Sequence, residues 1–431
     1  MQPINGILLL IKEWGNNFHS IIKHINFCYC FMSRRHFIKQ SGMLAGGLLL
    51  SNQWLHAFAG TSEKINIGII GCGDRGTGIM KMLNGLPDRF AISAICDVLD
   101  FRIENARKSS PSINPTVYKD YRKLLDDRTV QAVVIATTLS EHYRIAKDAL
   151  LAGKHVYLEK SMTYNIDQAI DLVKVSKAHP NQVVQVGHQY RSTPLYFKVK
   201  EMIEKGYLGK ITQMDCRWDR NWNWRRPVPA GYTDKQVNWR MYKEFSGGLP
   251  AELLSHQMDF INWAFNTHPD EVLGTGGIDY YKDGRETYDN VQVMLRYSKE
   301  NMIGNFGATC GNTHDGYIFK IKGTKGAVHL LMHDGVYYPE PTTKKELQTV
   351  DGVTGATKIE WNKEGGINIM NEPMKDGTWY ALLEFYDCIN NKKLPTSNII
   401  TGATTAICVH LANNAIFNHT IEKWKPAYNL L

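Results

Sequence analysis

Short apolar runs alternate with amphipathic stretches between Lys64 and Val186. The runs are rich in isoleucine and valine and are bounded by turn residues, which is typical of strands buried on both faces of a parallel sheet. The stretches between them have the periodicity of helices. This alternation predicts an α/β domain with a doubly wound parallel sheet. The predicted strands are Lys64–Ile70, Ala91–Cys96, Val130–Ala136, His155–Leu158 and Val183–Val186, and the predicted helices are Thr77–Leu83, Arg102–Lys108, Glu141–Ala152 and Ile166–His179.

The pattern changes after Gly187. Several later runs place apolar residues at every second position, as a half-buried antiparallel sheet does. Residues 340–375 are polar and irregular. We therefore predict a first domain over residues 60–187 and a second, α+β domain over residues 188–431 with a large, mostly antiparallel sheet and C-terminal helices. Its predicted strands are Ile211–Trp218, Val272–Ile278, Asn290–Tyr297, Met302–Ala308, Tyr317–Lys322 and Gly326–Leu331, and its predicted helices are Pro194–Gly206, Gly247–Ala264, Trp379–Asn390 and Gly402–Phe417.

Residues 1–59 have the pattern of a cleaved leader. The segment Ser33–Lys39 contains two adjacent arginines, the apolar run Met43–Leu50 follows, and Ala57-Phe58-Ala59 offers small residues for a signal peptidase. Together these features predict a twin-arginine signal peptide, and hence export through the twin-arginine machinery to the periplasm. The apolar run is too short for a permanent membrane span, although an uncleaved anchor is the alternative. We expect translation to start at Met32 rather than Met1, because residues 1–31 do not fit the signal.

Composition and charge exclude several classes of protein. Apolar residues make up 43% of the chain and charged residues 21%, which is typical of a globular protein. The formal net charge is +8, half of it lies in residues 1–60, and no block of basic residues indicates a nucleic-acid surface. The eight cysteines include no Cys-x-x-Cys pair, so we expect neither a metal site nor a disulfide framework.

The first predicted strand runs directly into a glycine-rich loop, Gly71-Cys72-Gly73-Asp74-Arg75-Gly76, and a helix follows. In this context Gly71 permits a tight turn, Gly73 lets the backbone approach a pyrophosphate, and Gly76 lets helix and strand pack closely. The second strand ends at Asp97, 21 residues beyond Gly76. A carboxylate at that spacing accepts hydrogen bonds from a ribose 2′-hydroxyl and repels a 2′-phosphate. The sequence therefore predicts a site for NAD rather than NADP.

Further polar residues follow the other predicted strands: threonines the third, an acid and a lysine the fourth, and a histidine the fifth. Ligands of a doubly wound sheet bind at these carboxyl ends. His142, on the helix after the third strand, completes the predicted group. The predicted cofactor-binding residues are Gly71, Gly73, Asp74, Arg75, Gly76, Asp97, Thr137, Thr138, His142, Glu159, Lys160 and His188.

Residues 218–245 are crowded with tryptophan and arginine. Indole rings stack on the apolar faces of sugars while arginine binds their hydroxyls, so this segment indicates carbohydrate contact. An oligomer interface and ordinary packing are the alternatives. Gln189 and Arg191 follow the fifth strand and are placed to reach cofactor or sugar. The predicted substrate-binding residues are Gln189, Arg191, Trp222, Arg240 and Asp259.

From about Lys64 to its C-terminus, the chain resembles the glucose–fructose oxidoreductase/inositol dehydrogenase family, often called Gfo/Idh/MocA. The matching motifs are the GxGxRG loop, AGKHVYLEKS at Ala152–Ser161 and GGLPAELLSHQMD at Gly247–Asp259. The chain departs from the family at Ser161 and Thr138, where proline is usual. The resemblance implies a Rossmann domain, a second domain with an open antiparallel sheet, and hydride transfer between a nicotinamide and a sugar or polyol hydroxyl.

The resemblance also implies roles for individual residues. Lys160 would lie beside the nicotinamide and the substrate hydroxyl, where it stabilises developing negative charge. Family members carry an aspartate and a histidine four residues apart on one helix, and Glu252 and His256 match that pair. His256 is the expected base, and Glu252 would orient it or bind another hydroxyl. Asp259 shares their helix face and is expected to be structural rather than catalytic.

Three functions are compatible with these residues. The first is an exported dehydrogenase that acts on a sugar, glycoside or polyol. The second is a glycosidase that uses bound NAD for transient oxidation and elimination; relatives of that kind lack the Glu159–Lys160 pair, which favours the dehydrogenase. The third is a cofactor-bound sensor without turnover. Because free NAD is scarce outside the cytoplasm, we expect a tightly bound cofactor, and we also expect a homo-oligomer.

Overall fold

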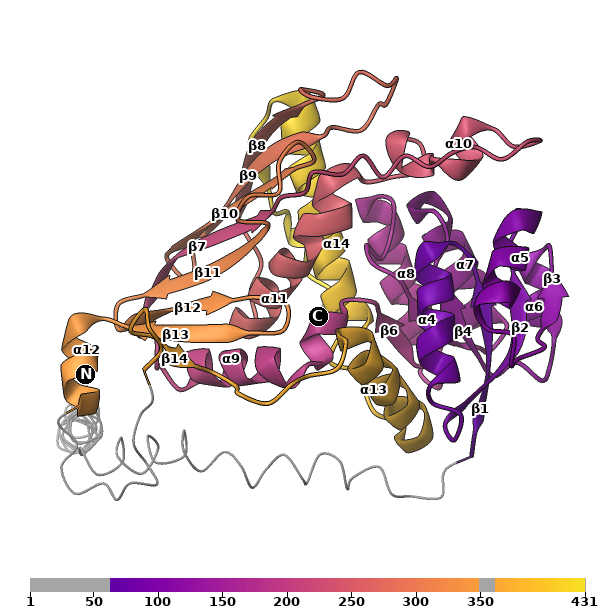
Figure 1. The fold of residues 1–431 in the computed structure, drawn as a ribbon, viewed down its shortest axis with the longest axis horizontal. Helices are drawn as coiled ribbons and strands as arrows, with labels where there is room; N and C mark the ends of the chain where they lie inside the picture. Colours follow the sequence, from indigo (N-terminus) through magenta and orange to yellow (C-terminus); the bar gives the residue numbers. More distant parts are fainter. Residues whose placement is uncertain (1–62, 349–360, 431) are drawn as a thin grey trace, which may run out of the picture. The chain divides into compact units, whose positions relative to one another are not determined.

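Six strands, all paired in parallel, form the first sheet of this computed structural model, which describes residues 63–348 and 361–430 (Figure 1). Strand β1 lies in the middle, between β2 and β4, so that the strand order reverses there. Ligands of such sheets bind at the reversal point. In order across the sheet the strands are β3 (Thr116–Tyr118), β2 (Phe90–Cys96), β1 (Ile65–Ile70), β4 (Ala132–Ile135), β5 (His155–Leu158) and β6 (Val184–Val186).

Helices cover both faces of this sheet, which explains why its strands are apolar at every position. In β4, Ala132 and Val134 share a core with α4, α5 and α13, whereas Val133 and Ile135 share the other core with α6, α7 and α8. The predicted doubly wound parallel sheet is confirmed. The helices are α4 (Asp74–Asn84), α5 (Asp100–Ser109), α6 (Tyr121–Asp126), α7 (Leu139–Leu151), α8 (Ile166–Ala178) and α13 (Gly377–Asn391).

Among the described residues, the second sheet has nine strands and is antiparallel except for the pair β7 and β10. Along β9 buried and more exposed residues alternate, so one face packs on the core and the other faces outward. This sheet confirms the predicted mostly antiparallel architecture. In order across it, the strands are β14 (Ile367–Asn368), β13 (Gly335–Pro339), β12 (Gly326–Leu330), β11 (Tyr317–Gly323), β7 (Ile211–Trp218), β10 (Met302–Thr309), β9 (Asn290–Tyr297), β8 (Glu271–Gly277) and β15 (Glu422–Lys423).

Helices α11 and α14 pack side by side behind the second sheet (Figure 1). By length and composition, α14 could cross a membrane, but 72% of its apolar window is buried inside the protein, as in a core helix. Both sheets belong to one compact unit. The remaining elements are η2 (Gln189–Ser192), α9 (Pro194–Glu204), α10 (Asp234–Val237), η3 (Trp239–Met241), η4 (Pro250–Leu254), α11 (Ser255–Phe265), α12 (Pro341–Gln348), α14 (Ile399–Asn418) and η6 (Pro426–Tyr428).

The structure adds elements that the apolar pattern does not predict. Strand β3 is three residues long and mostly exposed, so it carries no apolar run. Helix α12 and strand β14 lie in the segment predicted to be irregular. Helix α13 packs against the first sheet, although the predicted boundary at Gly187 assigns it to the second domain. The predicted leader, residues 1–59, lies outside the described residues.

Candidate active site

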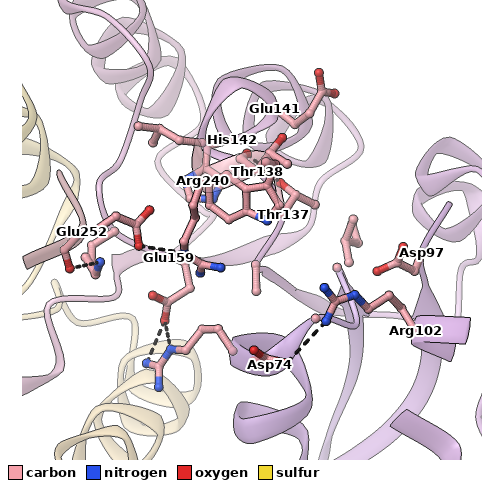
Figure 2. Close-up of a pocket in the computed structure, with 18 of the residues that line it drawn as sticks. Asp74, Asp97, Arg102, Thr137, Thr138, Glu141, His142, Glu159, Arg240 and Glu252 are labelled. Atoms are coloured by element: carbon pink, nitrogen blue, oxygen red, sulfur yellow. Dashed lines mark hydrogen bonds and ion pairs between the residues drawn. The ribbon is translucent and has the colours of Figure 1, made fainter. Parts of the chain in front are cut away.

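A cavity of about 980 Å³ lies at the carboxyl ends of the first sheet. Its lining includes Gly71, Gly73 and Asp97 from the first sheet's loops, together with Lys160, Ala251, Glu252, Leu253 and His256. Figure 2 shows Asp97 with Arg102 on one side of the cavity and Glu252 with Arg240 on the other. The structure therefore brings most of the predicted cofactor, catalytic and substrate residues to one cavity.

The glycine loop begins where β1 ends, and each of its glycines is explained by a different steric requirement. Gly71 has a φ of +97°, and a Cβ there would lie 2.5 Å from the carbonyl oxygen of Ala136. A Cβ on Gly76 would lie 1.8 Å from the carbonyl oxygen of Gly71. These two glycines are required by the protein's own packing, and Gly76 does not line the cavity.

Gly73 is different, because a Cβ there would make only an ordinary contact, with Arg102 Nη1 at 3.9 Å, and Gly73 lines the cavity. Gly73 is also the N-cap residue of α4, and no side chain caps that helix. The first N–H groups of a helix favour negatively charged ligands. The space and the uncapped helix start fit a pyrophosphate.

Asp97 directly follows β2 and holds the glycine loop in place. Its carboxylate accepts hydrogen bonds from the backbone N–H of Cys72 at 2.7 Å and of Leu99 at 2.9 Å. Burial raises the pKa of Asp97, while these hydrogen bonds and the nearby Arg102 act against that rise. Beside it, Val98 is 77% exposed and lines the cavity. No motif identifies Val98 or Arg102 as site residues. Their only sequence signal is that they lie one and five positions after Asp97.

Arg75 and Glu159 line the cavity and form an ion pair with each other. Arg75 Nε and Nη2 each lie 2.8 Å from Glu159 Oε1, and Arg75 Nη1 donates to Thr378 Oγ1 at 3.1 Å. The ion pair connects the glycine loop to the end of β5, and the hydrogen bond to Thr378 connects it to helix α13. Both residues, predicted to bind cofactor, are thus also parts of the scaffold that positions the loop.

Lys160 points across the cavity to the π-helical turn η4. Its Nζ donates to the carbonyl oxygen of Glu252 at 2.8 Å and lies 3.4 Å from that of Ala251. Burial lowers the pKa of Lys160, and the carboxylates of Glu252 and Glu159 oppose that effect. An ammonium group has three N–H donors, so one remains for a ligand oxygen. Lys160 is therefore placed to donate a hydrogen bond into the cavity.

Glu252 is held by Arg240, whose Nε donates to Glu252 Oε2 at 3.1 Å. Burial opposes the ionisation of Glu252, but the charges of Arg240 and Lys160 outweigh burial and lower its pKa. The side chain is therefore an ionised carboxylate at neutral pH. Two residues with separately predicted roles, one catalytic and one substrate-binding, form a single pair.

His256 lies among aromatic rings at the same end of the cavity. Its ring centre is 5.0 Å from that of Tyr190, 5.5 Å from that of Trp218 and 5.9 Å from that of His188. Burial and then the positive charge of Lys160 hold the pKa of His256 well below its usual value. The imidazole is therefore neutral at neutral pH.

The structure does not bring Arg191 and Asp259, both predicted to bind substrate, to the cavity. Both are buried, and Asp259 accepts hydrogen bonds from Arg191 Nε at 2.5 Å, Arg191 Nη2 at 2.9 Å and Thr405 Oγ1 at 3.0 Å. Neither lines the cavity. The ion pair connects η2 to α11. Because α11 is buried on nearly every side, Asp259 can contact the core although His256, three positions earlier, lines the cavity.

His188 also lies outside the cavity lining, contrary to its predicted contact with cofactor. It is 1% exposed, and its Nδ1 is 3.3 Å from Asp259 Oδ1. Burial lowers the pKa of His188 to about 4. Its ring packs edge-on against that of His256, so it contacts the cavity only through that neighbour.

The remaining predicted residues do line the cavity. His142 is buried, and its Nδ1 is 2.9 Å from the carbonyl oxygen of Ser161. Trp222 is 52% exposed at the cavity. Tyr190 and Trp218, whose rings surround His256, also line the cavity but are not among the predicted site residues. The sequence indicates them only by position: Tyr190 follows Gln189, and Trp218 begins the tryptophan-rich segment. The complete set of predicted residues in the lining is Gly71, Gly73, Asp74, Arg75, Asp97, Thr137, Thr138, His142, Glu159, Lys160, Gln189, Trp222, Arg240, Glu252 and His256.

Two family models match the chain. Residues 65–188 match the oxidoreductase family with an NAD-binding Rossmann fold, and residues 196–329 match the GFO/IDH/MocA C-terminal domain. The two matches meet close to the end of β6. They cover the parts of the chain that line the cavity from both sides.

Two curated relatives share 30% and 25% sequence identity with parts of the chain. An inositol 2-dehydrogenase/D-chiro-inositol 3-dehydrogenase of Lactiplantibacillus plantarum is 30% identical over 200 residues, which is 46% of this chain and 52% of the relative. The chain thus spans about half the length of such relatives. A glycosyl hydrolase family 109 protein of Shewanella amazonensis is 25% identical over 303 residues, 68% of this chain and 62% of the relative.

Solved structures share the fold. A levoglucosan dehydrogenase, in complex with NADH and levoglucosan, superimposes with a TM-score of 0.66 at 18% identity, over 84% of this chain and 99% of that chain. At this identity the likeness concerns the fold alone. Its coverage extends over both sheets.

Proposed function

Because the chain belongs to the GFO/IDH/MocA family of oxidoreductases, we propose that it transfers a hydride between a nicotinamide cofactor and a hydroxyl group of a sugar, glycoside or polyol. One observation carries the proposal: Lys160, Glu252 and His256 line the same cavity as the glycine loop. The relatives named as inositol and levoglucosan dehydrogenases support the same chemistry.

The proposed cofactor is NAD. When bound, it supplies the hydride acceptor of the oxidation. The space beside Gly73 and the uncapped start of α4 would hold its pyrophosphate, and the Asp97 carboxylate would face its ribose. A 2′-phosphate would meet that carboxylate, which favours NAD over NADP, while Arg102 nearby weakens the preference. We further propose that the cofactor is bound tightly.

The residues of the chain divide the proton chemistry between them. Neutral His256 accepts the hydroxyl proton as the alcohol is oxidised. Lys160 donates a hydrogen bond to the same oxygen and stabilises the negative charge that develops there. Ionised Glu252 fixes Arg240 and, through its carbonyl oxygen, Lys160. The aromatic rings of Tyr190 and Trp218 limit water around His256.

The purified protein tests this function. We expect mass spectrometry of the denatured protein to detect retained NAD, and a panel of sugars and glycosides to reduce it, as followed by nicotinamide absorbance. The physical reason is that the predicted cofactor-binding and catalytic residues line one cavity, so a hydride has a short path between the two molecules. Retained NAD that no polyol, sugar or glycoside reduces would contradict the proposal and favour a sensor without turnover.

A glycosidase with transient oxidation is the second candidate, favoured by the likeness to a glycosyl hydrolase family 109 protein. Against it stands the Glu159–Lys160 pair, which relatives of that kind lack. The two functions differ in redox balance. A dehydrogenase forms one NADH for each sugar oxidised, whereas the glycosidase releases a free sugar from a glycoside without net NADH.

We also propose export by the twin-arginine route to the periplasm, supported by Ser33–Lys39 and Ala57-Phe58-Ala59. That route carries folded proteins, so the cofactor would be bound before export. N-terminal sequencing of protein recovered from the periplasm is expected to start near Gly60. Recovery of the uncleaved chain from the cytoplasm alone would contradict export.

The proposal includes a homo-oligomer. The outward face of the second sheet carries Leu273, Met294 and Ile303, which are 37%, 38% and 36% exposed, and Leu273 pairs with Met294 across the strands. Apolar side chains on an open sheet face favour association. Light scattering of the purified protein would detect a monomer if this were wrong.

A further inference from the structure

Arg220 follows strand β7 and lines the cavity. Its guanidinium carbon lies 5.2 Å from the ring centre of Trp218 and 5.3 Å from that of Trp224. Each contact is an attraction between the positive charge and an aromatic ring, and indole offers no hydrogen-bond acceptor to the guanidinium. The two indoles thus hold Arg220 at the cavity without accepting a conventional hydrogen bond from its N–H groups.

Arg220 also differs from the other arginines of the cavity in its charge balance. Each of the six others lies within 4.0 Å of a carboxylate: Arg75 of Glu159, Arg102 and Arg226 of Asp74, Arg122 of Asp120, Arg144 of Glu141, and Arg240 of Glu252. Within residues 63–348 and 361–430, Arg220 has no ion pair. Its side chain is half-buried, so the charge is partly removed from water and has no carboxylate within ion-pair distance, which favours an anionic ligand there.

The place of Arg220 shows which molecule could bring that anion. The indole ring of Trp218 contacts Arg220, and its centre lies 5.5 Å from the ring centre of His256. Arg220 and His256 are therefore both neighbours of the same indole. The positive charge of Arg220 contributes to the lowered pKa of His256. A group bound by Arg220 therefore belongs to the molecule whose hydroxyl reaches His256.

We propose that Arg220 binds a negatively charged substituent of the sugar, so that the preferred substrate is an acidic sugar or its glycoside. The inference rests on the proposed function, since it names the substrate class of the same cavity. A guanidinium binds a carboxylate through two parallel hydrogen bonds, and it binds a sulfate ester in the same way. The shared chemistry is an oxyanion carried by the sugar.

The test compares matched ligands on the NADH-loaded protein. Methyl glucoside, methyl glucuronide and glucose 6-sulfate are titrated while tryptophan fluorescence is followed, which reports binding without turnover. We expect at least one of the two anions to bind roughly 10- to 100-fold more tightly than the neutral glucoside. The two anionic arms distinguish a carboxylate from a sulfate.

Variants assign the effect to one side chain. Arg220→Gln is expected to remove the advantage of the anionic ligand and to leave the neutral one nearly unchanged. Arg220→Lys keeps the charge without the planar fork and should retain part of it. Arg217→Gln removes the same charge three residues earlier, at an exposed position of β7 outside the cavity, and should change nothing.

The outcomes separate this inference from the proposed function. Equal binding of neutral and anionic sugars, binding of none, or an equal loss of both in Arg220→Gln and Arg220→Lys would overturn the role of Arg220. Anion-selective binding that depends on Arg220, with no reduction of NAD by any sugar, would overturn the oxidoreductase proposal and leave the anion site standing.

Discussion

Lys160→Ala is expected to lower kcat for sugar oxidation by about 10²- to 10³-fold, the usual effect of removing one preorganised donor from a developing oxyanion. The Nζ of Lys160 is anchored by the carbonyl oxygen of Glu252 at 2.8 Å, so the donor stands in place before the substrate arrives. The glycine loop does not contact this side chain through any of the hydrogen bonds described above. NAD affinity should therefore change by less than about threefold, a change of under 1 kcal/mol.

The experiment needs both readouts from the same preparation. Steady-state kinetics give kcat, and calorimetric titration with NADH gives the cofactor Kd. Lys160→Met preserves the length of the side chain and should behave like Lys160→Ala, because the effect comes from the lost donor. Lys174→Ala, at an exposed position of α8, is the matched control and should match the parent. Activity within a few-fold of the parent in both Lys160 variants would remove Lys160 from the proposed chemistry.

The scaffold of the site is predictable from the sequence because it depends on local patterns. Isoleucine- and valine-rich runs give β1 and β4, and each strand end then places its polar residues at one edge of the sheet. Gly71 and Gly76 follow from steric requirements of the turn, which the spacing already expresses. Strand β3 escapes prediction because three mostly exposed residues carry no apolar signal.

The pairing of charges is not predictable in the same way. Arg191 and Asp259 are polar residues near the motif, and only the packing of η2 on α11 reveals that they satisfy each other in the core. Arg75 and Glu159 are 84 positions apart and meet because β1 and β5 end at the same edge. Arg220 stands out only after the partners of the other arginines are known. Burial and pairing decide whether a charged residue serves the ligand or the fold.

Gly73→Val is expected to weaken NADH binding by more than about 100-fold, the effect of losing a few kcal/mol of contact with the pyrophosphate. A Cβ at Gly73 would lie 3.9 Å from Arg102 Nη1, its nearest neighbour, so the protein itself has room for the first carbon of a side chain. The room lies on the cavity wall at the start of α4, where the backbone must approach the phosphates. Gly73→Ala adds a single carbon and should show a smaller loss of about tenfold.

This graded pair separates ligand contact from folding. The φ of −70° at Gly73 is open to any residue, so thermal unfolding of Gly73→Ala and Gly73→Val should stay within a few degrees of the cofactor-free parent. Gly78 is the matched control: it lies on the same helix, outside the cavity, with nothing within 4 Å of a Cβ. Gly78→Ala should retain full NADH affinity and gain roughly 0.5–1 kcal/mol in stability, because alanine loses less backbone entropy in a helix. If Gly73→Val bound NADH as tightly as Gly78→Ala, the pyrophosphate could not pass over Gly73, and the cofactor would have to lie elsewhere in the cavity.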